Sequence, residues 1–169
     1  MTVPESSTLD PQQEVLDEEF EVKGQQWPQI QKGEYVGYCY NARFVVLFKF
    51  GASGRVFLDF KVYKTHDSFI AGEEPLALLY YVATVPGEWD KKAKKFIKEP
   101  VSRSSRLYRA YVVACGHEAR PDRLSLKTFK RKLFLVQVRE VKPKTNEDGT
   151  RTGPLEPYSV VDELLKRLA

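Results

Sequence analysis

Cysteine and histidine are scarce in this chain of 169 residues, which has two of each. Cys39 and Cys115 both lie in apolar stretches, which suits reduced thiols in a core and excludes a disulfide framework. No apolar run approaches the roughly 20 residues that a membrane helix needs. The amino terminus, MTVPESSTLD, lacks the basic start and apolar stretch of a secretion signal. These absences predict a cytoplasmic protein.

The chain also lacks the motifs of several enzyme classes. Neither a Gly-x-x-x-x-Gly-Lys loop nor a Gly-x-Gly-x-x-Gly turn occurs, so nucleotide hydrolysis and dinucleotide binding have no support. Cys115-Gly116-His117 supplies two of the three or four ligands that zinc requires, and no third group orients a Cys-His catalytic pair. We therefore expect no metal, no cofactor and no enzymatic activity.

A metal-dependent nuclease is the enzymatic alternative. Asp59, Asp67, Glu73 and Glu74 supply enough carboxylates for such a site. Glu73 and Glu74, however, follow Gly72 in a predicted loop, where solvated carboxylates are ordinary. No spacing connects the four acids to a basic catalytic residue, which disfavours this alternative.

Charge is distributed unevenly along the chain. The totals are 27 basic and 23 acidic residues, yet residues 1–22 hold seven acids and no Lys or Arg. Residues 91–142 show the opposite bias, with sixteen basic and four acidic residues. Clustered positive charge attracts polyanions and, by releasing counterions, gives sequence-independent affinity for nucleic acid. A basic surface that only improves solubility is the alternative interpretation.

The pattern along the chain predicts an acidic tail followed by one domain. Residues 1–31 are rich in Pro, Gln, Ser and acids, which predicts a flexible N-terminal tail. Residues 32–169 are expected to form a single barrel domain. We predict strands over 33–50, 55–63, 75–87, 132–141 and 158–161, with a loop over 88–100. Ser102 is expected to cap a helix that ends at Cys115 and Gly116, and a short C-terminal helix to end at Leu168.

This order of elements favours a mainly β (α+β) fold. Three antiparallel strands, a helix and two further strands are the order of the OB-fold, a small five-stranded barrel whose helix fills the gap between its third and fourth strands. We therefore expect an OB-like five-stranded barrel with one capping helix.

A more specific likeness covers Tyr108–Val141. The expected helix ends in Ala114-Cys115-Gly116 and leads, through a loop with Pro121, to Phe129-Lys130-Arg131-Lys132 and a strand. This stretch resembles the single-stranded-DNA-binding proteins of phages and mobile elements, in which a Phe-x-x-Lys lead-in precedes a barrel strand. Arg131 stands where that family usually has Gly. The resemblance implies binding of exposed single strands during replication or recombination of a mobile element, without chemistry.

The expected binding residues follow from the chemistry of single strands. A binder needs cations that track phosphates and rings on which bases stack. On the expected solvent face of 55–63, Phe57 and Tyr63 flank Lys61, so two bases would stack around one phosphate contact. In the alternative, both rings pack under a loop or the tail. The expected phosphate-binding residues are Arg43, Lys49, Arg55, Lys61, Lys91, Lys92, Lys94, Lys95, Arg103, Arg106, Arg109, Lys130, Arg131 and Lys132.

We therefore expect a non-enzymatic protein that binds single-stranded nucleic acid, with DNA as the expected form. The alternative is an interaction adaptor, whose barrel holds a protein or peptide while the acidic tail engages a partner. Edge strands of an open barrel offer a route to oligomers, although no residue specifies one.

The acidic tail generates the first prediction. If residues 1–22 compete with nucleic acid for the basic surface, removing them tightens the binding of poly-dT. The gain is greatest at low salt, where charges are least screened. Fluorescence titration of the full and shortened chains over a salt series measures it, and equal affinities at low salt would reject competition.

Overall fold

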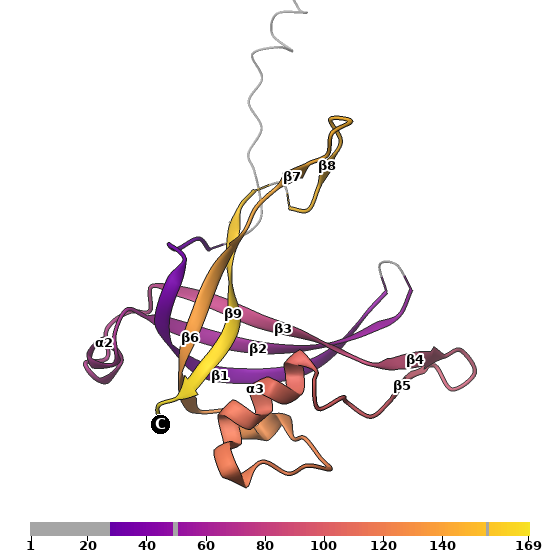
Figure 1. Cartoon of the computed structure of the whole chain (residues 1–169), viewed down its shortest axis with the longest axis horizontal. Helices are drawn as coiled ribbons and strands as arrows, with labels where there is room; N and C mark the ends of the chain where they lie inside the picture. Colours follow the sequence, from indigo (N-terminus) through magenta and orange to yellow (C-terminus); the bar gives the residue numbers. More distant parts are fainter. Residues whose placement is uncertain (1–27, 49–50, 155) are drawn as a thin grey trace, which may run out of the picture.

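A five-stranded antiparallel sheet forms the body of the protein in a computed structural model, which describes residues 28–48, 51–154 and 156–169 (Figure 1). Its strands are β1 (Gly33–Leu47), β2 (Ser53–Tyr63), β3 (Ala77–Val85), β6 (Lys132–Val141) and β9 (Tyr158–Arg167). Their order across the sheet is β3-β2-β1-β6-β9, and every neighbouring pair is antiparallel. The predicted mainly β class is confirmed.

Short elements connect these strands. They are the helices α2 (His66–Ile70) and α3 (Arg106–Cys115), the 3-10 turns η1 (Gly116–Glu118) and η2 (Leu126–Thr128), and the hairpin strands β4 (Gly87–Asp90), β5 (Lys95–Lys98), β7 (Lys144–Thr145) and β8 (Arg151–Thr152). The β7–β8 hairpin projects from the sheet on the side away from α3 (Figure 1). Within the described ranges, neither helix has the length and apolar character needed to cross a membrane.

The sheet is open, and α3 covers the gap between its edges. In the described chain β3 and β9 approach each other without forming a ladder, and the side chains of Tyr80 and Tyr158 are hydrogen-bonded across the gap. The Tyr81 hydroxyl donates to the carbonyl of Arg106 at 3.0 Å. At the other end of α3, Arg167 Nη1 donates to the carbonyl of Ala114 at 3.0 Å. Both edge strands are thereby attached to the same helix.

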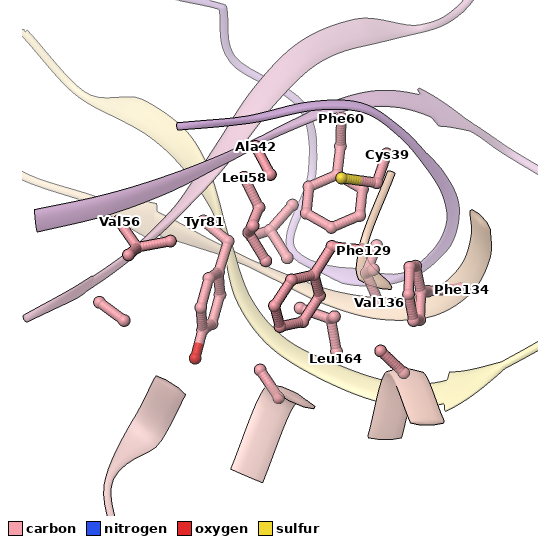
Figure 2. Close-up of a cluster of buried hydrophobic side chains, with 14 of the residues drawn as sticks. Cys39, Ala42, Val56, Leu58, Phe60, Tyr81, Phe129, Phe134, Val136 and Leu164 are labelled. Carbon is pink, nitrogen blue, oxygen red and sulfur yellow. The ribbon is translucent and has the colours of Figure 1, made fainter. Parts of the chain in front are cut away.

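Strict alternation along β2 divides the sheet into two faces. Val56, Leu58, Phe60 and Val62 are buried, as the sequence predicts, while the residues between them are only half-buried. The buried face meets Leu107, Tyr111 and Ala114, the predicted apolar stripe of α3. Phe129, which follows η2, completes the core, and Figure 2 shows it among Phe60, Val136 and Leu164.

The helix starts later than the sequence predicts. Ser105 rather than Ser102 caps it, because Ser105 Oγ accepts from the Tyr108 N–H at 3.1 Å. Ser102 Oγ instead accepts from the Ser104 N–H at 3.2 Å, in a turn that precedes the helix. The predicted end is confirmed: Gly116 follows Cys115 with a φ of 63°, a conformation that glycine adopts without steric cost.

The expected short C-terminal helix is wrong, because β9 continues to Arg167. Residues 163–168 are mostly good helix formers, so local preference favoured the helix. In the fold, Leu164 is buried in the core and pairs with Val136 of β6. Ladder hydrogen bonds and apolar burial outweigh the local preference.

The expected loop over 88–100 also contains more structure than predicted, since 87–98 folds into the β4–β5 hairpin. Phe96 secures the hairpin to the sheet, with its ring 5.7 Å from that of Phe44. A Cβ at Gly54 would lie 2.9 Å from the Phe96 ring, and one at Gly87 would lie 2.7 Å from it. The two glycines therefore allow the close approach of this ring.

The described part of the expected N-terminal tail is attached to the domain. Ser159 N–H donates to the carbonyl of Pro28 at 3.0 Å, and Ile30 N–H donates to Ser159 Oγ at 2.8 Å. Residues 28–30 of the expected tail are therefore held against β9. Residues 1–27 of the expected tail lie outside the described residues.

Phe129 provides a test of the core. Its side chain is 0% exposed, and we expect Phe129→Ala to lower the free energy of unfolding by about 3–5 kcal/mol. Urea denaturation measures the change. Ile70→Ala is the matched control, because Ile70 is 68% exposed and its truncation should cost about 0.5 kcal/mol or less. Equal effects of the two substitutions would contradict the placement of Phe129.

Candidate nucleic-acid interface

Cations and rings meet on the face of β1 and β2 that points away from the core. Arg43 lies opposite Phe57 in the register, with the guanidinium carbon 4.8 Å from the ring centroid. Arg43 Nε also donates to Asp59 Oδ2 at 3.2 Å, which holds the guanidinium over the ring. Phe57 is half-buried, and its ring meets that of Tyr80 in an edge-to-face arrangement, with 5.5 Å between the ring centroids. A base can stack on the outer plane of such a guanidinium.

Tyr40 is a second ring on this face, which the sequence analysis missed. It lies at the β-bulge between Cys39 and Asn41 and is 41% exposed. Lys61 Nζ lies 5.7 Å from its ring centroid. Partial burial and, secondarily, the Asp59 carboxylate raise the pKa of the Tyr40 hydroxyl, so the ring is neutral at physiological pH. The bulge disrupts the alternation of β1, and no local sequence signal marks it.

Tyr63 is not available to stack on a base, which corrects the sequence prediction. It is 8% exposed, and its ring packs on Phe69 of α2 with 5.3 Å between centroids. Phe69 also stacks on Tyr38 at 5.4 Å. Helix α2, rather than a loop or the tail, covers this ring at that end of β2.

The expected lysine cluster lies at the tip of the β4–β5 hairpin. Lys91, Lys92 and Lys94 occupy the exposed turn, and Lys95 begins β5. The hairpin also carries Trp89, whose ring contacts that of Phe48 edge to face at 4.9 Å. Phe48 is 60% exposed, which adds another accessible ring near these lysines. Lys49 lies outside the described residues.

The hairpin packs on the core side of the sheet end, opposite to Arg55. Its Phe96 lies against Gly54, on the face of β2 that carries Val56, whereas Arg55 points to the face that carries Phe57. The Arg55 guanidinium donates to Thr84 Oγ1 of β3 at 3.0 Å. Arg55 therefore extends the face of the Arg43–Phe57 pair.

The arginines of α3 do not share this surface. Phe57 and Tyr80 point away from the core, whereas α3 packs on the opposite face through Tyr81. Arg103 and Arg109 are exposed on the helix side, and Arg103 Nε donates to the carbonyl of Pro121 at 3.4 Å. The prediction of one furrow shared by the rings of β2 and these arginines is wrong, because the sheet separates them.

Arg106 has structural contacts. Its guanidinium lies 4.6 Å from the Tyr81 ring centroid and donates to the carboxylate and the carbonyl oxygen of Asp162 in β9. Asp162 Oδ1 also accepts from Arg139 Nε of β6 at 2.8 Å. These contacts connect α3 with β3, β6 and β9. Arg106 therefore holds α3 over the gap between the two edge strands.

The lead-in residues lie beside the β1 bulge. Arg131 N–H donates to the carbonyl of Cys39 at 2.8 Å, and Lys132 pairs with Cys39 in the register. Arg131 has a φ of 62°, a left-handed conformation that glycine adopts without steric cost. Lys130 and Arg131 are exposed, so both add charge near Tyr40.

On the outer face, Lys61, Arg43 and Arg55 follow the course of β1 and β2. Lys130–Lys132 lie at the bulge, and Lys91–Lys95 lie past the other end of the two strands, on the hairpin. Residues 40–47 of β1 span about 23 Å at the rise of a strand. We call this group of cations, with Tyr40 and Phe57, the β1–β2 track.

The structure places the residues considered for catalysis as follows. Cys39 is fully buried, and burial raises the pKa of its thiol to about 12, so it stays protonated at neutral pH. Among the described residues, no three His, Cys, Asp or Glu side chains are grouped closely enough to hold a metal ion. Asp59 is engaged with Arg43 and Asn41 on the sheet face.

No family model matches this chain, and no curated protein sequence matches it. Function is therefore inferred from the chain's own residues and their geometry.

The two cysteines provide a test of this description. The thiolate is the reactive form, so iodoacetamide at pH 8 should modify half-buried Cys115 and leave Cys39 intact in the native protein. Mass spectrometry of tryptic peptides measures both. Unfolding in guanidinium is the control and should expose both thiols. Modification of Cys39 at the native rate of Cys115 would contradict its burial.

Proposed function

We propose that this protein binds single-stranded nucleic acid, DNA in the first instance, along the β1–β2 track and without catalysing a reaction. The observation that carries the proposal is the pairing of each ring on the track with a cation, Arg43 with Phe57 and Lys61 with Tyr40. A single strand presents bases and phosphates in alternation, so alternating rings and cations match its chemistry.

The order of the strands supports the proposal, and we propose that the open sheet corresponds to an OB-like barrel. A meander of β1, β2 and β3 is followed by α3 and then by β6 and β9, with β6 beside β1 and β9 returning toward β3. In a partly open five-stranded barrel of this kind, the solvent face around the second and third strands and the adjoining loops bind oligonucleotides. Phe57, Tyr80 and Arg55 lie on that face here.

The charge of the track supports it further. Asp59 is the one acidic side chain that β2 places on this face, and it forms an ion pair with Arg43. Arg55 and Lys61 add positive charge along β2, and the four lysines of the hairpin add more past the end of the strands. Such a charged stripe concentrates a polyanion and releases its counterions.

The resemblance of Tyr108–Val141 to phage and mobile-element single-strand binders supplies the proposed context. Phe129 is the core residue of the lead-in, and Lys132 stands beside the β1 bulge. We therefore extend the proposal to replication or recombination of a mobile element.

Titration with fluorescent poly-dT over a salt series tests the proposal. We expect tight binding at low salt, with log affinity falling linearly with log salt by about 0.7 for each phosphate contacted. Lys91→Gln with Lys92→Gln should reduce the slope by about 1.4 if each lysine contacts one phosphate. Arg109→Gln with Lys127→Gln removes the same charge on the helix side and should leave the slope nearly unchanged.

The rings are tested by separate substitutions. Phe57→Leu and Tyr40→Leu keep apolar bulk but remove the stacking face, so each should weaken binding about 5-fold to 150-fold, the equivalent of 1–3 kcal/mol per base. The salt slope should stay the same because no phosphate contact is lost. Tyr63→Leu is the control, since that ring packs on Phe69 and its loss should leave the affinity unchanged.

The outcomes separate the alternatives. Failure to bind poly-dT at low salt would refute the proposal and favour an interaction adaptor. Magnesium-dependent shortening of the oligonucleotide would refute the absence of catalysis. Equal slopes for the hairpin and helix-side variants would refute the β1–β2 track as the binding surface.

A further inference from the structure

A cleft separate from the β1–β2 track lies between α3, the end of β5 and the segment 119–126. Its volume is about 430 Å³. Its floor contains ends of the sheet and of α3, chiefly Val56, Val85 and Leu107, and Leu124 closes it from the opposite side. A volume of this size accommodates one or two large side chains with their backbone.

The rim of the cleft is basic. Lys98, Arg103 and Arg123 surround it, and all three are exposed. The carboxylate of Asp122 also lies on the rim, and Arg120 Nη2 is 3.4 Å from it. The rim therefore carries a surplus of positive charge around an apolar interior.

This lining fits an acidic peptide better than a base. A nucleobase gains most from the open face of a ring, but the face of Phe44 in the cleft is covered by Lys98 Nζ at 4.4 Å. Tyr108 leans on Tyr111 with centroids 5.9 Å apart, and its hydroxyl lies 3.5 Å from the Arg120 carbonyl. The remaining lining is chiefly aliphatic and suits a Leu or Phe side chain.

The chain itself contains a segment of the matching chemistry. Residues 14–22, EVLDEEFEV, place Leu16 and Phe20 among five acids, with no Lys or Arg before residue 23. We propose that this acidic segment binds in the cleft of its own chain, with Leu16 or Phe20 in the apolar interior and its carboxylates at Lys98, Arg103 and Arg123.

The length of chain permits this contact. Pro28 is held at the start of β9 by Ser159, so Phe20 and Leu16 lie eight and twelve residues before a defined attachment point. Chains of these lengths reach at most about 26 and 40 Å. A domain of about 140 residues has a radius of gyration near 14 Å, so the reach is comparable with its width.

The test is carbodiimide cross-linking of the full chain in dilute buffer without nucleic acid. This reagent joins a carboxylate to a lysine in direct contact, and peptide mass spectrometry locates each link. We expect links from residues 14–22 to Lys98 in the monomer. Leu16→Ala with Phe20→Ala should reduce them about tenfold, because the apolar anchors are lost, while links to Lys91–Lys95 stay the same.

A second measurement keeps the proposal testable if cross-linking is inefficient. Methyl NMR signals of Val85, Leu107 and Leu124 should shift between the full chain and the Leu16→Ala, Phe20→Ala variant. The methyls of Val36 and Leu133, in a separate buried cluster, are the control and should not move.

Each contrary outcome overturns the proposal. Links spread evenly over the exposed lysines would indicate unspecific charge attraction. Links to Lys98 that survive the double substitution would show that no apolar anchor is bound, and links confined to a dimer would assign the segment to a second copy. Because the assay contains no nucleic acid, its failure and failure of poly-dT binding are distinguishable.

Discussion

The contact of α3 with both edges of the open sheet is the interaction on which the rest of the structure depends. β3 and β9 form no ladder with each other, so their facing edges need another partner. The helix supplies it through the Tyr81 hydroxyl, the Arg106–Asp162 contacts and the Arg167 guanidinium. Arg106 also stacks on Tyr81, so one side chain joins helix and strands at the centre of the gap. With the gap covered, Phe129 and Leu107 complete the main core, and Arg55 and Phe57 on the other face of β2 stay partly exposed.

That division into two faces shapes the proposed function. Because side chains alternate along a strand, burial of Val56 and Leu58 requires Arg55 and Phe57 to point outward. The same alternation puts Tyr81 against α3 and Tyr80 beside Phe57. The chain therefore places cations on both sides of one sheet, and those on each side have different contacts. On the β1–β2 track they accompany rings, at α3 Arg106 binds Asp162, and around the cleft they surround an aliphatic interior. We propose a nucleic-acid strand as the ligand of the track and an acidic peptide as the ligand of the cleft.

Much of the fold was predictable because its signals are local. The alternation of 55–63, the apolar run around Leu79 and the glycine at 116 indicate two strands and a helix end without knowledge of their neighbours. Prediction was wrong where tertiary contacts outweigh local preference. Leu164 lies in a run of helix formers but pairs with Val136 in the core. Trp89 and Phe96 lie in a lysine-rich stretch that resembles a loop, and they form a hairpin because Gly54 and Gly87 leave room for a ring. Ser102 and Ser105 are equivalent as caps in the sequence, and only the path of the chain selects Ser105.

For the candidate site, the sequence alone determined composition, namely a basic body, an acidic N-terminal segment and rings next to cations in 55–63. Composition and alternation are properties of single segments, so both can be read directly from the sequence. The tertiary structure decided which groups share a surface. It covered Tyr63 with α2, exposed Tyr40 at a bulge, placed Lys130–Lys132 beside that bulge and separated the α3 arginines from Phe57 by a sheet. Such proximity depends on pairing register and on which element covers an edge, and both arise only when distant segments pack together.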